Sequence, residues 1–124
     1  MSCLAKVRRL DGVVVVDLSG RFTVGDATGV IRDAVAALLQ SGEQCILLNL
    51  ADVTHIDSAA GIGELVSSYT SAVRQGARVK LLRAGKRVDY VLHVVGLDRV
   101  FEIFDDEDAA VRSFSAPDAV AIAR

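Results

Sequence analysis

Apolar and polar positions divide the chain into short extended runs and longer helical stripes. The first two extended runs lie at residues 5–10 and 13–18, and Asp11-Gly12 separates them. An Asp-Gly pair between extended runs is a strong signal for a β-hairpin. The four consecutive valines of the second run are typical of a strand inside a sheet, whereas the first run alternates only partly. We therefore expect an antiparallel hairpin whose first strand lies at the sheet edge.

Residues 45–66 form the most strongly patterned part of the chain. They open with an apolar run, which is typical of a strand buried on both faces, and continue through a polar turn. After the turn, apolar residues recur at helical spacing to about residue 74, and Gln75-Gly76 is a helix stop signal. The inward stripe predicted for this helix consists of Ile62, Leu65, Val66, Tyr69, Ala72 and Val73.

Extended and helical segments alternate on both sides of this stretch. A loop at residues 19–22 precedes a helical stripe over residues 27–39, for which Asp26 is the candidate N-cap. A strand, a helix, a strand and a helix follow at residues 78–82, 86–95, 100–104 and 105–114. The order ββαβαβαβα predicts a single α/β domain with a mixed, mostly parallel sheet packed with helices. We expect it to span residues 4–114, with residues 115–124 as a frayed C-terminal tail.

Composition narrows the possible functions. The 124 residues are 52% hydrophobic and 24% charged, with a net charge of −2, which is typical of a globular domain. Nucleic-acid binding is disfavoured because no cluster of Lys and Arg occurs. No apolar run approaches the ~20 residues of a membrane span, and the N-terminus lacks the apolar core of a signal peptide. We therefore expect a cytoplasmic protein without membrane insertion. Cys3 and Cys45 lack metal-ligand spacing and are expected to be reduced thiols, so no metal and no cofactor is predicted.

The polar turn after the central strand carries the candidate chemistry. Asp57 and Ser58 stand where the strand gives way to the helix, and either can supply the N-cap oxygen. Small residues and two glycines follow, so the turn is expected to be tight and its backbone little covered. Gly61 and Gly63 indicate either the close approach of another segment or merely a tight turn. Ser58 thus presents a hydroxyl at the positive end of a helix, where added negative charge is tolerated.

Four segments, at residues 15–21, 48–58, 61–65 and 95–104, occur in an order that resembles the STAS domain of bacterial anti-sigma factor antagonists. The resemblance covers about residues 4–114. It implies a small cytoplasmic protein, not an enzyme, that binds an anti-sigma factor, typically a serine kinase of the histidine-kinase-like ATPase type. Binding would free a sigma factor, phosphorylation of a serine in the turn would abolish binding, and a serine phosphatase would restore it. A phosphate adds about −1.5 to −2 charges, enough to disrupt an apolar contact surface.

The turn departs from the family pattern by one residue. Family members place two small residues between Asp and Gly, whereas Asp57-Ser58-Ala59-Ala60-Gly61 has three. The usual phosphoacceptor precedes the glycine, and that position falls on Ala60 or Ala59, neither of which has a hydroxyl. Ser58 is therefore the candidate phosphorylation site in the turn, while its other interpretation is that of a helix cap alone.

The resemblance also predicts where a partner docks. The face is expected to centre on residues 56–64 and the loop at residues 19–24, since the carboxyl ends of parallel strands meet at one sheet edge. Glu64 is expected to be exposed there, because it falls opposite Leu65 and Val66 on the helix. Asp57 is either a cap and turn-former or a neighbour that shapes access for the kinase. The predicted contact residues are Asp57, Ser58, Ala59, Ala60, Gly61, Ile62, Gly63, Glu64 and Arg21.

Two enzyme-like or signalling alternatives fit less well. A hydrolase with Ser58 as nucleophile would need a Gly-x-Ser-x-Gly turn and a histidine oriented by an acid, and the turn lacks that pattern. A receiver-like phosphoaspartate domain would need an acid pair before the acceptor and a late lysine, neither of which occurs. A third alternative keeps the STAS fold as a stressosome-like scaffold or as the cytoplasmic partner of a lipid transporter.

Overall fold

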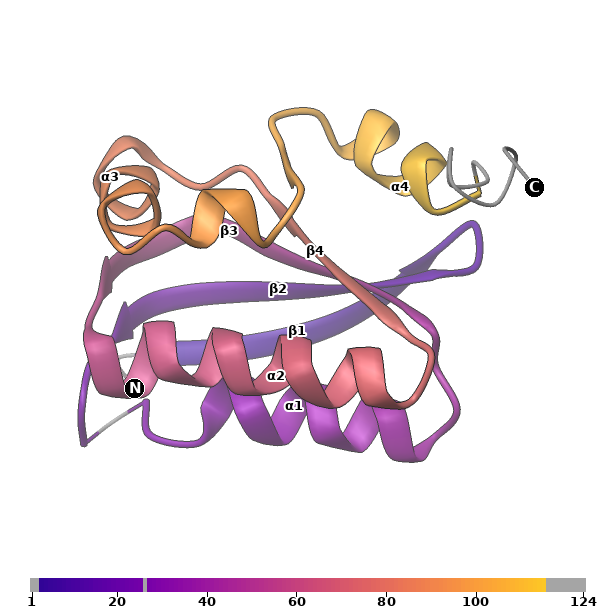
Figure 1. Ribbon diagram of the computed structural model, residues 1–124, viewed down its shortest axis with the longest axis horizontal. Coiled ribbons are helices and arrows are strands. Elements are labelled where there is room, and N and C mark those ends of the chain that lie inside the picture. Colours follow the sequence, from indigo (N-terminus) through magenta and orange to yellow (C-terminus); the bar gives the residue numbers. More distant parts are fainter. Residues whose placement is uncertain (1–2, 26, 116–124) are drawn as a thin grey trace.

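Five strands lie side by side in the order in which they occur along the chain, in a computed structural model that describes residues 3–25 and 27–115 (Figure 1). The first two strands form the predicted antiparallel hairpin, and the second to the fifth run parallel. The strands are β1 (Cys3–Leu10), β2 (Val13–Phe22), β3 (Cys45–Ile56), β4 (Arg78–Leu82) and β5 (Ile103–Phe104). The single α/β domain with a mixed, mostly parallel sheet is therefore confirmed.

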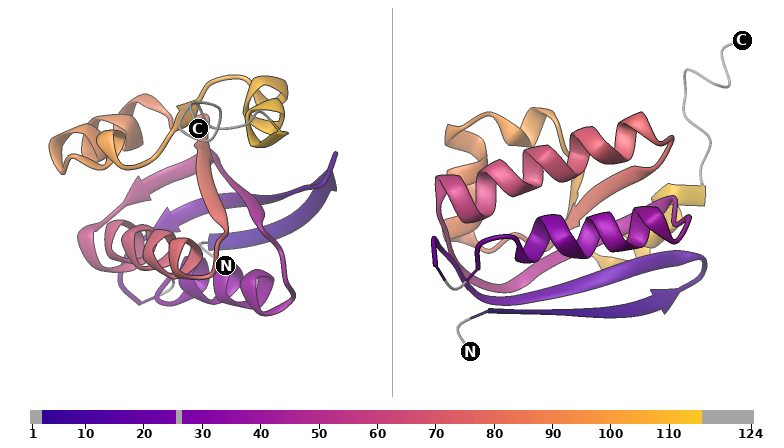
Figure 2. Two further views of the ribbon diagram at one scale, coloured as in Figure 1. Left: turned by 45° about the vertical axis from the view of Figure 1, so that its right-hand side comes forward. Right: turned by 90° about the horizontal axis from the view of Figure 1, so that it is seen from below.

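Helices cover both faces of this sheet. The pair α1 (Val30–Gln40) and α2 (Gly63–Arg74) packs on one face, and α3 (Lys86–Val94) contributes Val88 and Leu92 to the same core (Figures 1 and 2). The last helix, α4 (Glu107–Ser115), lies on the opposite face over a smaller core. This arrangement follows from successive right-handed crossovers in one direction, which place the crossover helices on one side of a parallel sheet.

Side chains of the inner strands alternate between the two cores. Val16 and Leu48 face α1 and α2, whereas Val15 and Leu47 face α4, and all four are fully buried. The sequence therefore reads as an unbroken apolar run, since a strand covered on both faces needs no polar positions.

The two central strands are longer than their apolar runs. Residues 19–22 belong to β2 and not to the predicted loop, and β3 continues to Ile56 through the polar segment. The pairing survives two register shifts, next to Ser19 and Arg21. Backbone pairing holds this section together, but apart from Phe22 and Val53 its side chains are exposed or only partly buried, so hydrophobic periodicity does not reveal it.

Other predictions also need correction or fall on residues outside the described part of the chain. The buried face of α2 is formed by Glu64, Leu65, Ser68 and Ala72, whereas Val66 and Val73 are 41% and 55% exposed. The strand predicted at 100–104 is shortened to β5, because Val100 and Phe101 continue the turn of a short 3-10 helix, η2 (Leu97–Arg99), with both N–H groups donating to Leu97 O. The Asp26 cap and the tail beyond residue 115 lie outside the described residues, and α1 begins after Gly29.

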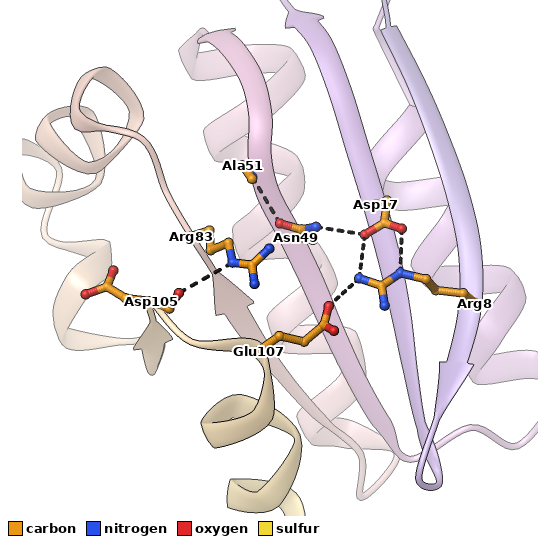
Figure 3. Close-up of polar contacts among 7 residues, drawn as sticks. All are labelled: Arg8, Asp17, Asn49, Ala51, Arg83, Asp105 and Glu107. Atoms are coloured by element: carbon orange, nitrogen blue, oxygen red, sulfur yellow. Dashed lines mark hydrogen bonds and ion pairs between the residues drawn. The ribbon is translucent and has the colours of Figure 1, made fainter.

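A polar network anchors the start of α4 to the sheet, as Figure 3 shows. Arg8 Nε lies 2.7 Å from Asp17 Oδ2, and the same guanidinium forms an ion pair with Glu107 of α4. Asn49 Nδ2 donates to Asp17 Oδ1 at 2.8 Å. The Arg8 guanidinium, with help from the Asn49 amide, holds the pKa of Asp17 below its usual value. The network explains why polar residues stand in the middle of two central strands.

Two cations of β4 bind the other end of α4. Arg78 Nη2 donates to the carbonyl oxygen of Phe114 at 2.6 Å, and Lys80 Nζ donates to Ser113 Oγ at 2.9 Å. Both cations also lie over the Phe114 ring. Positive charge at a helix C-terminus is favourable because the last carbonyl oxygens are unsatisfied there. With the Glu107 ion pair at its start, α4 is held at both ends.

Candidate functional site

The candidate turn is a π-helical segment, η1 (Ser58–Ile62), which joins β3 to α2. Ile62 N–H donates to Asp57 O at 2.9 Å, and Gly63 N–H donates to Ser58 O. Both bonds span five residues, whereas an α-helical turn spans four. The additional residue of the turn is therefore taken up inside one wide helical turn, and α2 continues regularly from Gly63.

Asp57, not Ser58, is the N-cap of this segment. Its Oδ1 accepts from Ala60 N–H at 2.7 Å, which is the usual geometry of an N-cap carboxylate. Its Oδ2 accepts from Val24 N–H at 2.7 Å, so the same side chain also holds the loop between β2 and α1. Ser58 is exposed, and its hydroxyl has no hydrogen-bond partner among residues 3–25 and 27–115. The structure thus leaves the Ser58 hydroxyl available for chemistry.

Glu64 is buried, contrary to the sequence-based expectation. It is 5% exposed, and its Oε2 and Oε1 accept from Gly29 N–H at 2.5 Å and Arg32 N–H at 3.1 Å. These N–H groups belong to the N-cap and the third residue of α1, two of the donors that a helix start leaves unsatisfied. Gly29 has φ 86° and no side chain to cap its own helix, so a carboxylate from α2 does this instead. Glu64 therefore positions the start of α1, and its expected exposure is wrong; its predicted contact with a partner stays a prediction.

The two carboxylates together join the predicted docking segments. Asp57 binds the backbone at Val24, and Glu64 binds it at Gly29 and Arg32. The β2–α1 loop and the start of α2 accordingly lie side by side at one end of the sheet, in Figure 1 and in the right panel of Figure 2. The loop and the turn therefore form one surface, as the carboxyl-end argument predicted.

The two glycines of the turn, Gly61 and Gly63, differ in how closely other atoms approach them. A Cβ atom on Gly61 would lie 2.0 Å from Ile56 Cγ1, so close packing against the end of β3 excludes any side chain. A Cβ on Gly63 would meet only Ser58 O, at 3.1 Å. Of the remaining predicted contacts, Ala60 is 1% exposed and Ile62 is partly buried against the core. A partner meeting this turn would contact Ser58 and the exposed Gly63 more readily than its buried members.

A cationic group lies next to the turn, and of its members only Arg21 was among the predicted contact residues. Arg21 is exposed and pairs with His55 across β2 and β3, and Arg87 at the start of α3 lies 2.8 Å from His55 (Nη1 to Nε2). A guanidinium can only donate, so Nε2 accepts and the ring proton is on Nδ1, 3.1 Å from Thr54 Oγ1. Partial desolvation, with Arg21 and Arg87 nearby, lowers the pKa of His55. The imidazole is thus held neutral between two arginines.

The described residues provide no other evident chemistry at this end of the sheet. No group of three or more His, Cys, Asp or Glu side chains within residues 3–25 and 27–115 can hold a metal ion. In the same part of the chain, no helix is long and apolar enough to cross a membrane.

Fold and site together define a small α/β domain that presents an exposed serine on a capped turn at the carboxyl ends of its parallel strands. Residues 5–110 match the family model of the STAS domain, and the chain belongs to that family. It is 24% identical over 112 residues to the anti-sigma-B factor antagonist of Bacillus subtilis, a match that covers 90% of this chain and all of the relative.

Solved structures have the same fold. An anti-sigma factor antagonist from Mycobacterium paratuberculosis superimposes with a TM-score of 0.82 at 21% identity, over 93% of this chain and 96% of that one. The Bacillus cell fate determinant SpoIIAA in its phosphorylated form gives a TM-score of 0.69 at 19% identity, over 90% and 99% of the two chains. At these identities the likeness shows the fold alone.

Proposed function

We propose that this chain is an anti-sigma factor antagonist, which binds an anti-sigma factor serine kinase in the cytoplasm and thereby releases a sigma factor. The relative from Bacillus subtilis is named an anti-sigma-B factor antagonist, and it matches over its full length. The observation that carries the proposal is the exposed hydroxyl of Ser58 on a turn made rigid by Asp57 and Glu64. The protein acts by docking and not by catalysis.

Phosphorylation of Ser58 is the proposed switch. A phosphate there would add about −1.5 to −2 charges to the first position of a helical segment. The segment can carry that charge because its N-terminal dipole is positive, although Asp57 beside it opposes the change. The docked partner would meet both the charge and its hydration shell, so binding would be lost while the fold survives. A serine phosphatase would reverse the switch.

The test measures kinase binding and phosphate transfer with the same variants. The wild type and Ser58→Ala should bind the cognate anti-sigma kinase with similar affinity, whereas Ser58→Glu should bind about tenfold or more weakly, since a like charge or desolvated charge at an interface costs several kcal/mol. After incubation with ATP, the wild type should gain one phosphate at Ser58 and Ser58→Ala none. Ser67→Glu, which adds the same charge on an exposed position of α2, is the matched control and should bind normally.

The outcomes separate the parts of the proposal. Tight binding without phosphate would make the protein a constitutive antagonist and remove the switch. Failure of the wild type to bind the kinase would refute the sigma-factor role and favour a STAS scaffold or the cytoplasmic partner of a transporter.

A further inference from the structure

We propose that Arg21, His55 and Arg87 form a docking patch for a carboxylate-rich segment of the protein partner. We call these three residues the cationic patch. The inference deepens the proposed function and rests on it in one respect, namely that the partner docks at the Ser58 end of the sheet.

The two arginines of the cationic patch have no acidic partner in the part of the chain that the structure describes. Among residues 3–25 and 27–115, Arg8, Arg9 and Arg32 pair with carboxylates, whereas Arg21 and Arg87, like Arg74 and Arg112, do not. Arg87 donates to an imidazole instead. Guanidinium groups favour carboxylates and phosphates, which they bind with two parallel N–H donors. Most of the donors in the cationic patch therefore face no acceptor of the kind that suits them.

The charge of the cationic patch differs from that of the chain. The chain as a whole has a net charge of −2, so a group of two arginines beside a histidine is not an average property of its surface. The carboxylate nearest to His55 in the sequence is Asp57, directly after β3, and its two oxygens accept from backbone N–H groups of Ala60 and Val24. By contrast, six of the 16 acidic residues of the chain are concentrated at residues 98–108, in the segments that include η2 and the start of α4.

The cationic patch lies close to the Ser58 turn. Arg21 and His55 are direct neighbours in the β2–β3 ladder, and His55 stands three residues before Ser58. A partner that covers the Ser58 turn would also meet the cationic patch. Anionic charge brought there would favour protonation of His55, and the imidazolium would then release Arg87, because it no longer offers an acceptor. The cationic patch can thus gain one positive charge and a free guanidinium as the acidic segment arrives.

The nature of the ligand follows from the size and charge of the site. Two arginines and one histidine suit a short run of Asp or Glu side chains, whereas nucleic acid and anionic membranes select larger basic surfaces on proteins of positive charge. The same chemistry gives a direction to the switch, because a phosphate on Ser58 would repel an acidic segment seated beside it.

The experiment compares charge reversal at two places. Arg21→Glu/Arg87→Glu should lower the affinity for the cognate anti-sigma kinase about 10- to 100-fold and weaken the dependence of association on salt. Arg74→Glu/Arg112→Glu makes the same change of net charge at exposed positions in the last turns of α2 and α4 and should leave binding unchanged. Arg21→Lys/Arg87→Lys keeps the charge but loses the paired N–H donors, so its affinity should lie between those of the wild type and the double reversal.

A second probe works without the kinase. A ten-residue peptide rich in Glu, added to the wild-type protein at low salt, should shift the NMR signals of Arg21, His55 and Arg87 in a saturable way and leave those of Arg74 and Arg112 in place. Kinase binding that is unchanged by the double reversal would overturn the inference and leave the proposed function standing. A wild type that does not bind the kinase but binds the peptide would refute the function and support the patch. Stronger binding to anionic vesicles or single-stranded DNA than to the peptide would also overturn the inference.

Discussion

Removal of the Glu64 carboxylate should loosen the start of α1, although Glu64 belongs to α2. The side chain is buried and accepts two backbone N–H groups, at Gly29 and Arg32. Hydrogen bonds to a charged group contribute about 1.5–3 kcal/mol, and a buried N–H left unpaired costs about 1–3 kcal/mol. Glu64→Gln retains one acceptor and should cost about 1–3 kcal/mol in the free energy of unfolding. Glu64→Ala loses both acceptors and should cost about 2–4 kcal/mol.

Urea unfolding at pH 7 followed by circular dichroism gives the free energies, and native-state hydrogen exchange locates the damage. The amide protons of Gly29 and Arg32 should exchange faster in Glu64→Gln, while those in the middle of β3 should be changed only by the loss of global stability. The control is Asp89→Asn, which removes an exposed carboxylate from the first turn of α3 and should cost less than about 1 kcal/mol.

Two results would refute the reasoning about Glu64. If Glu64→Gln is as stable as the wild type or more stable, the cost of burying the carboxylate exceeds what its two hydrogen bonds contribute. If stability falls but the Gly29 and Arg32 amides keep their relative protection, the loss comes from somewhere other than the α1 cap.

Three further predictions concern single positions. Gly61→Ala should cost about 1–3 kcal/mol in urea unfolding, since its Cβ would overlap the Ile56 side chain; a neutral result would show that this side chain can repack at no cost. In an NMR pH titration, His93, which lies beside Asp98, should have a pKa above 6.5 and His55 a pKa below it. His93 therefore stabilises the fold at low pH and loses that contribution as pH rises through its pKa, whereas protonation of His55 destabilises the fold as pH falls. The reverse order of the two pKa values would contradict the assigned contacts. Ser68→Ala should be neutral or stabilising by up to about 1 kcal/mol, because the buried Ser68 hydroxyl has no partner among the described residues; a large loss of stability would reveal a hydrogen bond there.

Local sequence patterns predicted much of the fold and the location of the candidate site. The Asp11-Gly12 hairpin, the doubly buried run of β3 and the helical spacing after it depend on neighbouring residues, and the structure confirms the element order they predict. The turn at Asp57 and Ser58 was likewise visible, because a capping residue followed by small residues marks a helix start.

Several features depended on contacts between distant residues. Glu64 was assigned to the exposed side of its helix by spacing, yet it serves a helix that begins 34 residues earlier, at Val30. No pattern in the sequence pointed to this role: Asp26 was the candidate cap of that helix, whereas α1 begins after Gly29, which has no side chain to cap it. Arg87 was missed as a neighbour of the site for the same reason, since only the packing of α3 brings it to His55.

The sequence by itself determined the α/β class, the order of strands and helices along the chain, and the presence of one hydroxyl in the turn, because these follow from the periods of buried side chains and from residue chemistry. The tertiary structure decided how the turn is held and what surrounds it. Its wide π-helical turn, its caps at Asp57 and Glu64 and the cationic patch all arise where two or three segments meet. Contacts between such segments satisfy backbone donors and bring together charges that are distant in the sequence, so the hydrophobic period of a single segment does not predict them.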